Sequence, residues 1–398
     1  MRTDLTTGTR QNSGPGSGRR GLRLVPLNRN TGPMKFSFGI VLLLSSPILA
    51  GDDQSALPGD EPFRLFEGEQ EFDLEYEALL SSEIEVHRAA MRYSQQRGAW
   101  RADLGVSITD YSIDYQPFAP LGGLPADLSE TNRQFSLSVG YDVSESLESS
   151  FTINHYDGFA DFRSIWIAEY YRQAFNFPGS GYQAPDPHGF SMTSGWVWDP
   201  KPGTRVSLDL NYGEDTIAPG WSFRDPGNDL LKNRAFSLSW EQAINPSLKT
   251  ETSFTYFDIT DREARMILQS SWNWAITDDL TLGANIGGSR EEPDFEAIYG
   301  GISLTYQVNP RLSIRADARL YDDTGEIETS GFNASAPGLQ SSEVGLSALY
   351  EIGPHSFRIG VSRYLTDYGA PDPENEFFTN LYDDRDWWTI RTAYSFRF

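Results

Sequence analysis

Cysteine is absent from this chain of 398 residues. Its absence excludes disulfides, thiolate metal sites, cysteine nucleophiles and a lipid-anchored cysteine. Long apolar runs are also missing. No stretch approaches the roughly 18 to 20 apolar residues that a membrane helix needs, and the mean hydropathy is −0.46. The sequence is therefore not that of a helical membrane protein.

Basic residues are few compared with acidic ones. The chain has 32 Lys and Arg against 56 Asp and Glu. Residues 1–50 hold seven of the bases and one of the acids, which leaves 25 bases and 55 acids beyond them, a net charge of −30. Nucleic-acid binding requires a basic surface, so we expect no nucleic-acid partner.

One short apolar run lies near the start. Lys35 precedes apolar residues 36–44, and Ala50 closes the following stretch. A basic tip, a short apolar region and a small residue at the cut are typical of a secretory signal peptide, which we predict over 34–50 with cleavage near Ala50. The alternative is a buried core helix. Residues 1–33 are rich in Gly, Ser and Pro, which predicts a disordered extension upstream of the true start or a long signal lead.

The final residues alternate between two kinds of side chain. Every second position up to the last residue is apolar, aromatic or Thr: Trp388, Ile390, Thr392, Tyr394, Phe396 and Phe398. Successive side chains of a strand point to opposite faces, so the pattern predicts a strand with one apolar face. Because it ends on an aromatic residue, this strand resembles the last strand of bacterial outer-membrane β-barrels. The resemblance implies an assembly signal formed by Tyr394, Phe396 and Phe398.

The same alternation recurs throughout residues 99–398. Short turns such as Asn245-Pro246 and Asn309-Pro310 join strands in pairs, and longer loops rich in Asp, Gly and Pro separate the pairs. This asymmetry predicts an all-β fold, a transmembrane antiparallel up-and-down β-barrel of about 14 strands. A soluble barrel or sandwich would show the same alternation with its apolar face inward.

Two segments break this pattern. In the acidic segment 51–98, apolar residues recur at three- and four-residue steps from Phe72 to Met91, which predicts an amphipathic helix. This helix would be either a periplasmic lead-in or a plug of the lumen. In the long loop 157–188, residues 164–175 predict a second helix. That loop either folds inward to narrow a pore or forms an outer lid.

Patterns for catalysis and metal binding are weak. Only four histidines occur, and the residues two positions from His155 are Ile153 and Asp157, so the His and Ser arrangement of outer-membrane phospholipases is missing. Acidic loop pieces offer oxygen ligands without the spacing of a calcium loop. We predict no enzymatic activity, no cofactor and no metal site.

Charged residues of both signs share the polar parity of the predicted strands. This parity faces the lumen of a membrane barrel, where opposed charges either set ion selectivity or form salt bridges that only hold the barrel's shape. The candidate lumen residues are Arg205, Asp209, Arg265, Arg315, Asp317, Arg319, Arg358 and Arg391.

Three functions fit these features. The first is a porin-like outer-membrane channel for passive passage of small polar or charged solutes, which favours cations because its mouth is acidic. The second is a hydrophobic-compound transporter of the fourteen-stranded fatty-acid-channel type, with 51–98 as its hatch. The third is a closed structural or surface-binding barrel. We expect outer-membrane lipid, lipopolysaccharide, the barrel-assembly machinery and small solutes as partners of a monomer or homotrimer.

Overall fold

The computed structural model describes residues 69–117, 123–216, 230–259, 263–292, 295–325, 337–369 and 381–398. The predicted extension 1–33, the signal peptide 34–50 with its cleavage near Ala50, and the beginning of the acidic segment 51–98 lie outside the described residues. So do parts of the long loops.

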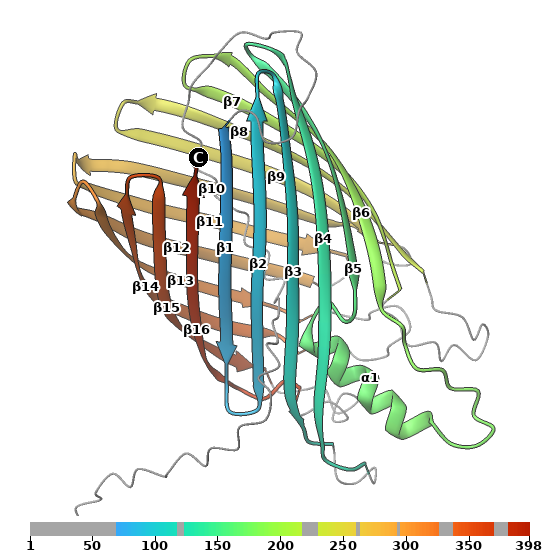
Figure 1. Ribbon diagram of the computed structural model, residues 1–398. Helices are drawn as coiled ribbons and strands as arrows, with labels where there is room; N and C mark the ends of the chain where they lie inside the picture. Colours follow the sequence, from blue (N-terminus) through green and yellow to red (C-terminus); the bar gives the residue numbers. More distant parts are fainter. Residues whose placement is uncertain are drawn as a thin grey trace, which may run out of the picture. The chain divides into compact units, whose positions relative to one another are not determined.

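The described residues form a closed antiparallel barrel of sixteen strands, each paired with its neighbours in the sequence (Figure 1). The strands are β1 (Glu69–Leu80), β2 (Ile84–Arg97), β3 (Trp100–Tyr115), β4 (Ala126–Ser144), β5 (Leu147–Asp157), β6 (His188–Lys201), β7 (Thr204–Asp215), β8 (Leu231–Asn245), β9 (Leu248–Ile259), β10 (Arg265–Thr277), β11 (Leu280–Glu291), β12 (Phe295–Asn309), β13 (Leu312–Asp323), β14 (Leu339–Ile352), β15 (His355–Tyr368) and β16 (Asp386–Arg397). The last strand, β16, pairs with β1, so the sheet has no open edge.

The prediction of about 14 strands was wrong, because the expected helix in 51–98 is a β-hairpin. β1 and β2 pair with each other, and they close the barrel through β16 and β3. A step of four residues fits a strand as well as a helix, since positions such as Phe72 and Tyr76 share one face of a strand. The strands predicted from residue 99 onward are present as β3 to β16.

The outer face of the barrel is apolar, and aromatic side chains gather near its short-turn end. These exposed aromatic residues are Trp100, Tyr141, Trp198, Trp240, Trp274, Tyr306, Tyr350 and Phe357. Bands of this kind lie at the membrane interface of barrels that cross a bilayer, where amphipathic rings contact both the acyl chains and the head groups.

The polarity of β3 reverses toward the long-loop end. Its outer face exposes apolar residues as far as Ile108, which is 43% exposed. Beyond that point the opposite, inner face carries Tyr111, Ile113 and Tyr115, each 1% exposed. The strand therefore extends past the outer apolar belt, and its apolar inner side there is covered by other parts of the chain.

Helix α1 (Phe162–Phe175) lies at this end, beside β3 (Figure 1). Its first turn is capped by Asp161, whose carboxylate accepts a hydrogen bond from the Ser164 backbone N–H at 2.8 Å. The helix occupies the part of loop 157–188 for which the sequence predicts one. In the part of the chain that the structure describes, no helix is long and apolar enough to cross a membrane.

Candidate functional site

The inner wall of β1 carries an acidic stripe: Glu71, Asp73, Glu75 and Glu77. These residues alternate with the apolar residues of the same strand, of which Leu74 is exposed on the outer face. Arginines of β16 contact the stripe. The Arg391 Nε donates to Glu77 at 2.6 Å, and the Arg397 Nε donates to Glu71 at 3.1 Å. The acids expected in a lead-in or plug are thus part of the barrel wall.

A second charged centre lies two strands from β1, around Asp103 on β3. Its carboxylate accepts hydrogen bonds from Arg92 at 2.7 Å and from Ser94 at 2.6 Å, both on β2. The Arg101 Nε lies 3.1 Å from the same carboxylate. Arg88 of β2 lies 3.9 Å from Glu75 of the stripe. Charged contacts therefore connect the wall across β16, β1, β2 and β3.

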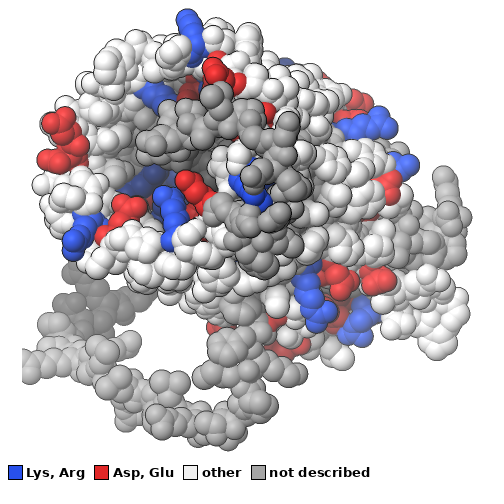
Figure 2. All heavy atoms as spheres, turned by 45° about the horizontal axis from the view of Figure 1, so that its top comes forward, with Lys and Arg blue, Asp and Glu red and all other residues white. Residues whose placement is uncertain are grey.

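The eight predicted lumen residues fall into two groups. Five lie on the neighbouring strands β13 to β16, beside the acidic stripe: Arg315, Asp317, Arg319, Arg358 and Arg391. The other three lie apart, on β7 and β10: Arg205, Asp209 and Arg265. Figure 2, turned toward the short-turn end, shows side chains of both signs around the hollow there.

Four of these residues have ion-pair partners. Arg391 binds Glu77 as described, and the other three pairs are Arg205 with Asp199 at 2.9 Å, Arg265 with Glu291 at 2.8 Å, and Arg319 with Glu343 at 3.7 Å. For Arg315, Asp317, Arg358 and Asp209, the described residues provide no ion pair. The structure thus contains both kinds of group that the sequence analysis left open: salt bridges within the wall and charges available to a solute.

Between these charged residues, the lumen wall is neutral and polar. Short side chains bridge adjacent strands there, as in the hydrogen bonds from Thr152 to Ser138 and from Asn211 to Thr193, both at 2.8 Å. A cavity of about 460 Å³ lies against strands β1 to β5, and its lining includes Asp73 and Arg92. Charged side chains and neutral polar side chains are thus interspersed around the lumen.

An apolar cluster, here called the mouth core, fills the inner side of the barrel at the long-loop end. It consists of Ile84, Val86, Tyr111, Ile113, Tyr115, Phe159, Phe162, Ile165, Trp166, Leu381, Tyr382 and Trp387. Helix α1 supplies its centre: the rings of Trp166 and Tyr115 lie 5.2 Å apart, and those of Phe162 and Trp387 lie 5.7 Å apart. The mouth core therefore attaches α1 to the inner wall.

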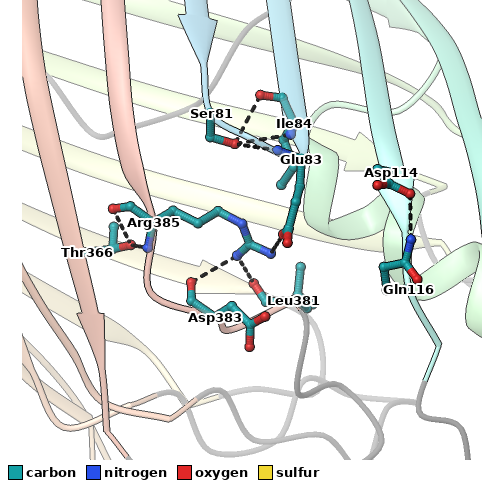
Figure 3. A network of polar contacts seen from close by, with 9 residues as sticks. All are labelled: Ser81, Glu83, Ile84, Asp114, Gln116, Thr366, Leu381, Asp383 and Arg385. Carbon is teal, nitrogen blue, oxygen red and sulfur yellow. Dashed lines mark hydrogen bonds and ion pairs between the residues drawn. The ribbon is translucent and has the colours of Figure 1, made fainter. Parts of the chain in front are cut away.

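Arg385 fixes the mouth core to the turn between β1 and β2 (Figure 3). Its guanidinium donates to the backbone carbonyls of Leu381 and Asp383 at 2.9 and 3.0 Å, and to the Glu83 carboxylate at 2.9 Å. The same group lies 6.0 Å from the centre of the Trp166 ring. The Arg385 side chain is only 3% exposed, so one buried cation connects three separate loops.

Further contacts hold the start of α1, and an ion pair stabilises the helix itself. Near its start, the Tyr111 hydroxyl donates to the Ala160 carbonyl at 2.9 Å, and Arg163 donates to the Tyr368 hydroxyl at 3.1 Å. Within the helix, Glu169 accepts two hydrogen bonds of 2.6 Å from Arg172. Burial alone would raise the pKa of Glu169, but the hydrogen bonds from Arg172 and a neighbouring glutamine hold it below its ordinary value. The stabilising contribution of Glu169 is therefore present near neutral pH and is lost as the pH falls through that lowered pKa.

Replacing Arg385 with Met is expected to loosen the mouth while leaving the barrel intact. The substitution removes the donor for two buried carbonyls and for Glu83, a local cost of up to about 3 kcal/mol because the carboxylate is partly solvated. We expect faster proteinase cleavage within 157–188 of the folded protein. The matched control is Arg363→Met, which removes an exposed arginine paired with Asp386. Equal cleavage of both variants would contradict this role of Arg385.

The residues of the predicted assembly signal lie where β16 closes the barrel. The Tyr394 hydroxyl lies 2.9 Å from the His355 Nδ1, and the Phe396 ring stacks on His355 at 4.9 Å. Phe398 exchanges two backbone hydrogen bonds with Gln70 and is 57% exposed. Their role in assembly stays a prediction.

A closed antiparallel barrel with an apolar outer belt, a polar lumen and short turns at one end has the fold of bacterial outer-membrane β-barrel proteins. Among solved structures, a bacterial polysaccharide outer membrane secretin is similar, with a TM-score of 0.51 and 9% identity over 83% of this chain and 98% of that chain. The CymD monoaromatic hydrocarbon channel has a TM-score of 0.44 and 9% identity, over 84% of this chain and 89% of that chain. The Pseudomonas putida toluene transporter TodX has a TM-score of 0.36 and 12% identity, over 83% of this chain and 89% of that chain.

No family model and no curated protein sequence matches the chain. The structural likeness therefore defines the fold, as the resemblance of the terminal strand implied.

Proposed function

We propose that this protein is an outer-membrane channel for passive passage of small polar or charged solutes, with a preference for cations. The observation that carries this proposal is the lining of the lumen, where acidic and basic side chains are interspersed with hydroxyl and amide side chains. Such groups replace part of the hydration of a polar solute as it passes.

The cation preference rests on β1. Its four inward acids add negative charge to a wall that the predicted strands alone would have made nearly neutral. A lumen lined by an excess of one charge attracts counter-ions and repels co-ions. Because Asp73 forms no ion pair with the described residues, part of this charge is available to a passing cation.

The polar lining favours this function over transport of a hydrophobic compound. Such a transporter requires apolar surface that its ligand contacts. The inward apolar side chains gather in the mouth core, where they are buried against one another. In the proposed setting, outer-membrane lipid and lipopolysaccharide surround the exposed outer belt, and the assembly machinery recognises Tyr394, Phe396 and Phe398.

Current through the purified, folded protein in a planar bilayer tests the proposal. We expect discrete conductance steps, and in a salt gradient a reversal potential whose sign shows that cations cross more readily than anions. High salt should weaken the preference, because ions screen the wall charges. Folded protein that inserts and carries no current would instead identify a closed structural barrel. The same bilayers report whether steps occur singly, as for a monomer, or in threes.

A further inference from the structure

Tyrosines line the inner wall near the long-loop end, apart from the mouth core. Tyr299 is the fifth residue of β12, which begins at that end, and Tyr321 is third from the end of β13, which returns there. The two residues face each other directly in the strand register. Their rings are nearly parallel, with an interplanar angle of 20° and centroids 6.5 Å apart. Tyr299 and Tyr321, here called the tyrosine pair, thus form one continuous aromatic surface.

Glycine allows the Tyr299 ring to lie against the wall. A Cβ atom at Gly287 on the neighbouring strand β11 would lie 2.4 to 2.6 Å from three atoms at the hydroxyl end of that ring. Because these distances are nearly equal, the ring presents its face to the glycine. Its opposite face is turned to the lumen, and the residue is half-buried. The Tyr299 hydroxyl donates to the Gln269 side chain at 3.2 Å.

The opposite side of the barrel repeats this arrangement. Tyr156 lies on β5, seven strands from β12 in a ring of sixteen. Its ring covers Gly189, where a Cβ atom would meet it at 2.4 Å. The Tyr156 hydroxyl donates to Asp215 at 2.7 Å, and the second oxygen of Asp215 accepts from Asn233 at 2.6 Å. Two aromatic surfaces with polar rims therefore face the same lumen.

We propose that the tyrosine pair is a binding station for the pyranose rings of sugars within the lumen. A pyranose has C–H groups on its faces and hydroxyls around its rim. Its faces match the apolar faces of aromatic rings, and its rim matches the hydroxyls and the Gln269 amide beside them. The inference deepens the proposed function, because it rests on solutes entering the lumen.

Other solutes fit these surfaces less well. A hydrocarbon would cover the tyrosine hydroxyls and the Gln269 amide without offering them hydrogen bonds, and burying unpaired polar groups is costly. A simple cation would bind best at free carboxylates, whereas both Asp215 oxygens already accept hydrogen bonds from Tyr156 and Asn233. A ring-shaped solute with many hydroxyls satisfies both parts of the surface.

Saturation-transfer NMR with maltotriose and cellotriose tests the station, using the folded barrel in a detergent without a sugar head group. We expect transfer to the C–H protons of at least one of the two sugars in the unmodified protein. The double variant Tyr299→Ala/Tyr321→Ala should weaken sugar binding about tenfold, since two stacking contacts are lost. The variant Tyr299→Phe/Tyr321→Phe, which keeps both rings, should retain most of the affinity.

Two further variants separate stacking from general effects on the fold. Tyr306→Ala/Tyr350→Ala removes two tyrosines from the outer face, where they are 51% and 41% exposed, and should bind sugar normally. Gly287→Val keeps the tyrosine pair but forces the Tyr299 ring off the wall, and should weaken binding.

Three results would overturn the inference: no transfer to either sugar, unchanged binding by the double Ala variant, or displacement of bound sugar by benzyl alcohol but not by glycerol. Conductance is measured on the same preparations. Sugar binding without current contradicts the proposed channel alone, whereas current without sugar binding contradicts the binding station alone.

Discussion

Replacing helix α1 with a short Gly/Ser linker is expected to raise the single-channel conductance several-fold. The helix lies at the long-loop end, and its apolar side packs on the inner wall through the mouth core. Removing residues 162–175 takes away this obstruction but none of the strand pairs that close the barrel. The polar lumen below would then open directly to the outside.

A single substitution should act in the same direction. Trp166 is 2% exposed at the centre of the mouth core, and replacing such a residue with Ala costs about 3–5 kcal/mol. We expect single channels of the Trp166→Ala variant to switch frequently between the original conductance and the larger conductance of the linker variant. The control is Phe177→Ala, which removes an aromatic residue that follows the same helix and is 58% exposed. Unchanged conductance in the linker variant would mean that α1 does not limit the pore.

Neutralising the acidic stripe should have the largest effect on selectivity. The variant Glu71→Gln/Asp73→Asn/Glu75→Gln/Glu77→Gln removes four negative charges from the lumen and leaves Arg391 and Arg397 without their partners. The wall then loses its excess of negative charge, because the other strands carry nearly equal numbers of acidic and basic side chains. We expect the reversal potential in a salt gradient to fall toward zero, so that the cation preference is lost.

The matched control removes four exposed acids that lie outside the stripe: Glu85→Gln, Asp157→Asn, Glu292→Gln and Glu296→Gln. These side chains are 60% to 66% exposed. The control variant has the same net charge as the stripe variant, so the two differ only in the position of the lost charges. Selectivity should stay as it was. If both variants shift the reversal potential equally, overall charge and not the stripe sets the preference.

The sequence predicted most of the barrel because alternation is a local property. From Trp100 to Phe398, turns and parity locate each strand without knowledge of its neighbours. The first hairpin was missed because the four-residue spacing of Phe72 and Tyr76 is shared by helices and strands. The acidic residues distinguish a strand from a helix more clearly. Glu71, Asp73, Glu75 and Glu77 occupy every second position, which is the period of a strand.

The mouth was beyond the reach of sequence patterns because its contacts are distant along the chain. Arg385 and Glu83 are 302 positions apart, yet they form one ion pair. The pattern of residues 164–175 predicted the helix, but not which wall it packs on. The tyrosine pair depends on the register of β12 and β13 and on Gly287 of a third strand. Only the closed barrel brings such residues together.

The change of polarity along β3 means that the two parts of this strand bury their apolar side chains in different surroundings. A strand that crosses a bilayer needs about 9–11 residues, whereas β3 has 16. As far as Ile108, its apolar side chains face outward, where lipid would be their only favourable surroundings. From Tyr111 onward they face a core that the protein itself provides, as in a water-soluble domain. The hydrophobic effect thus stabilises one part of the strand through its outer face and the other part through its inner face.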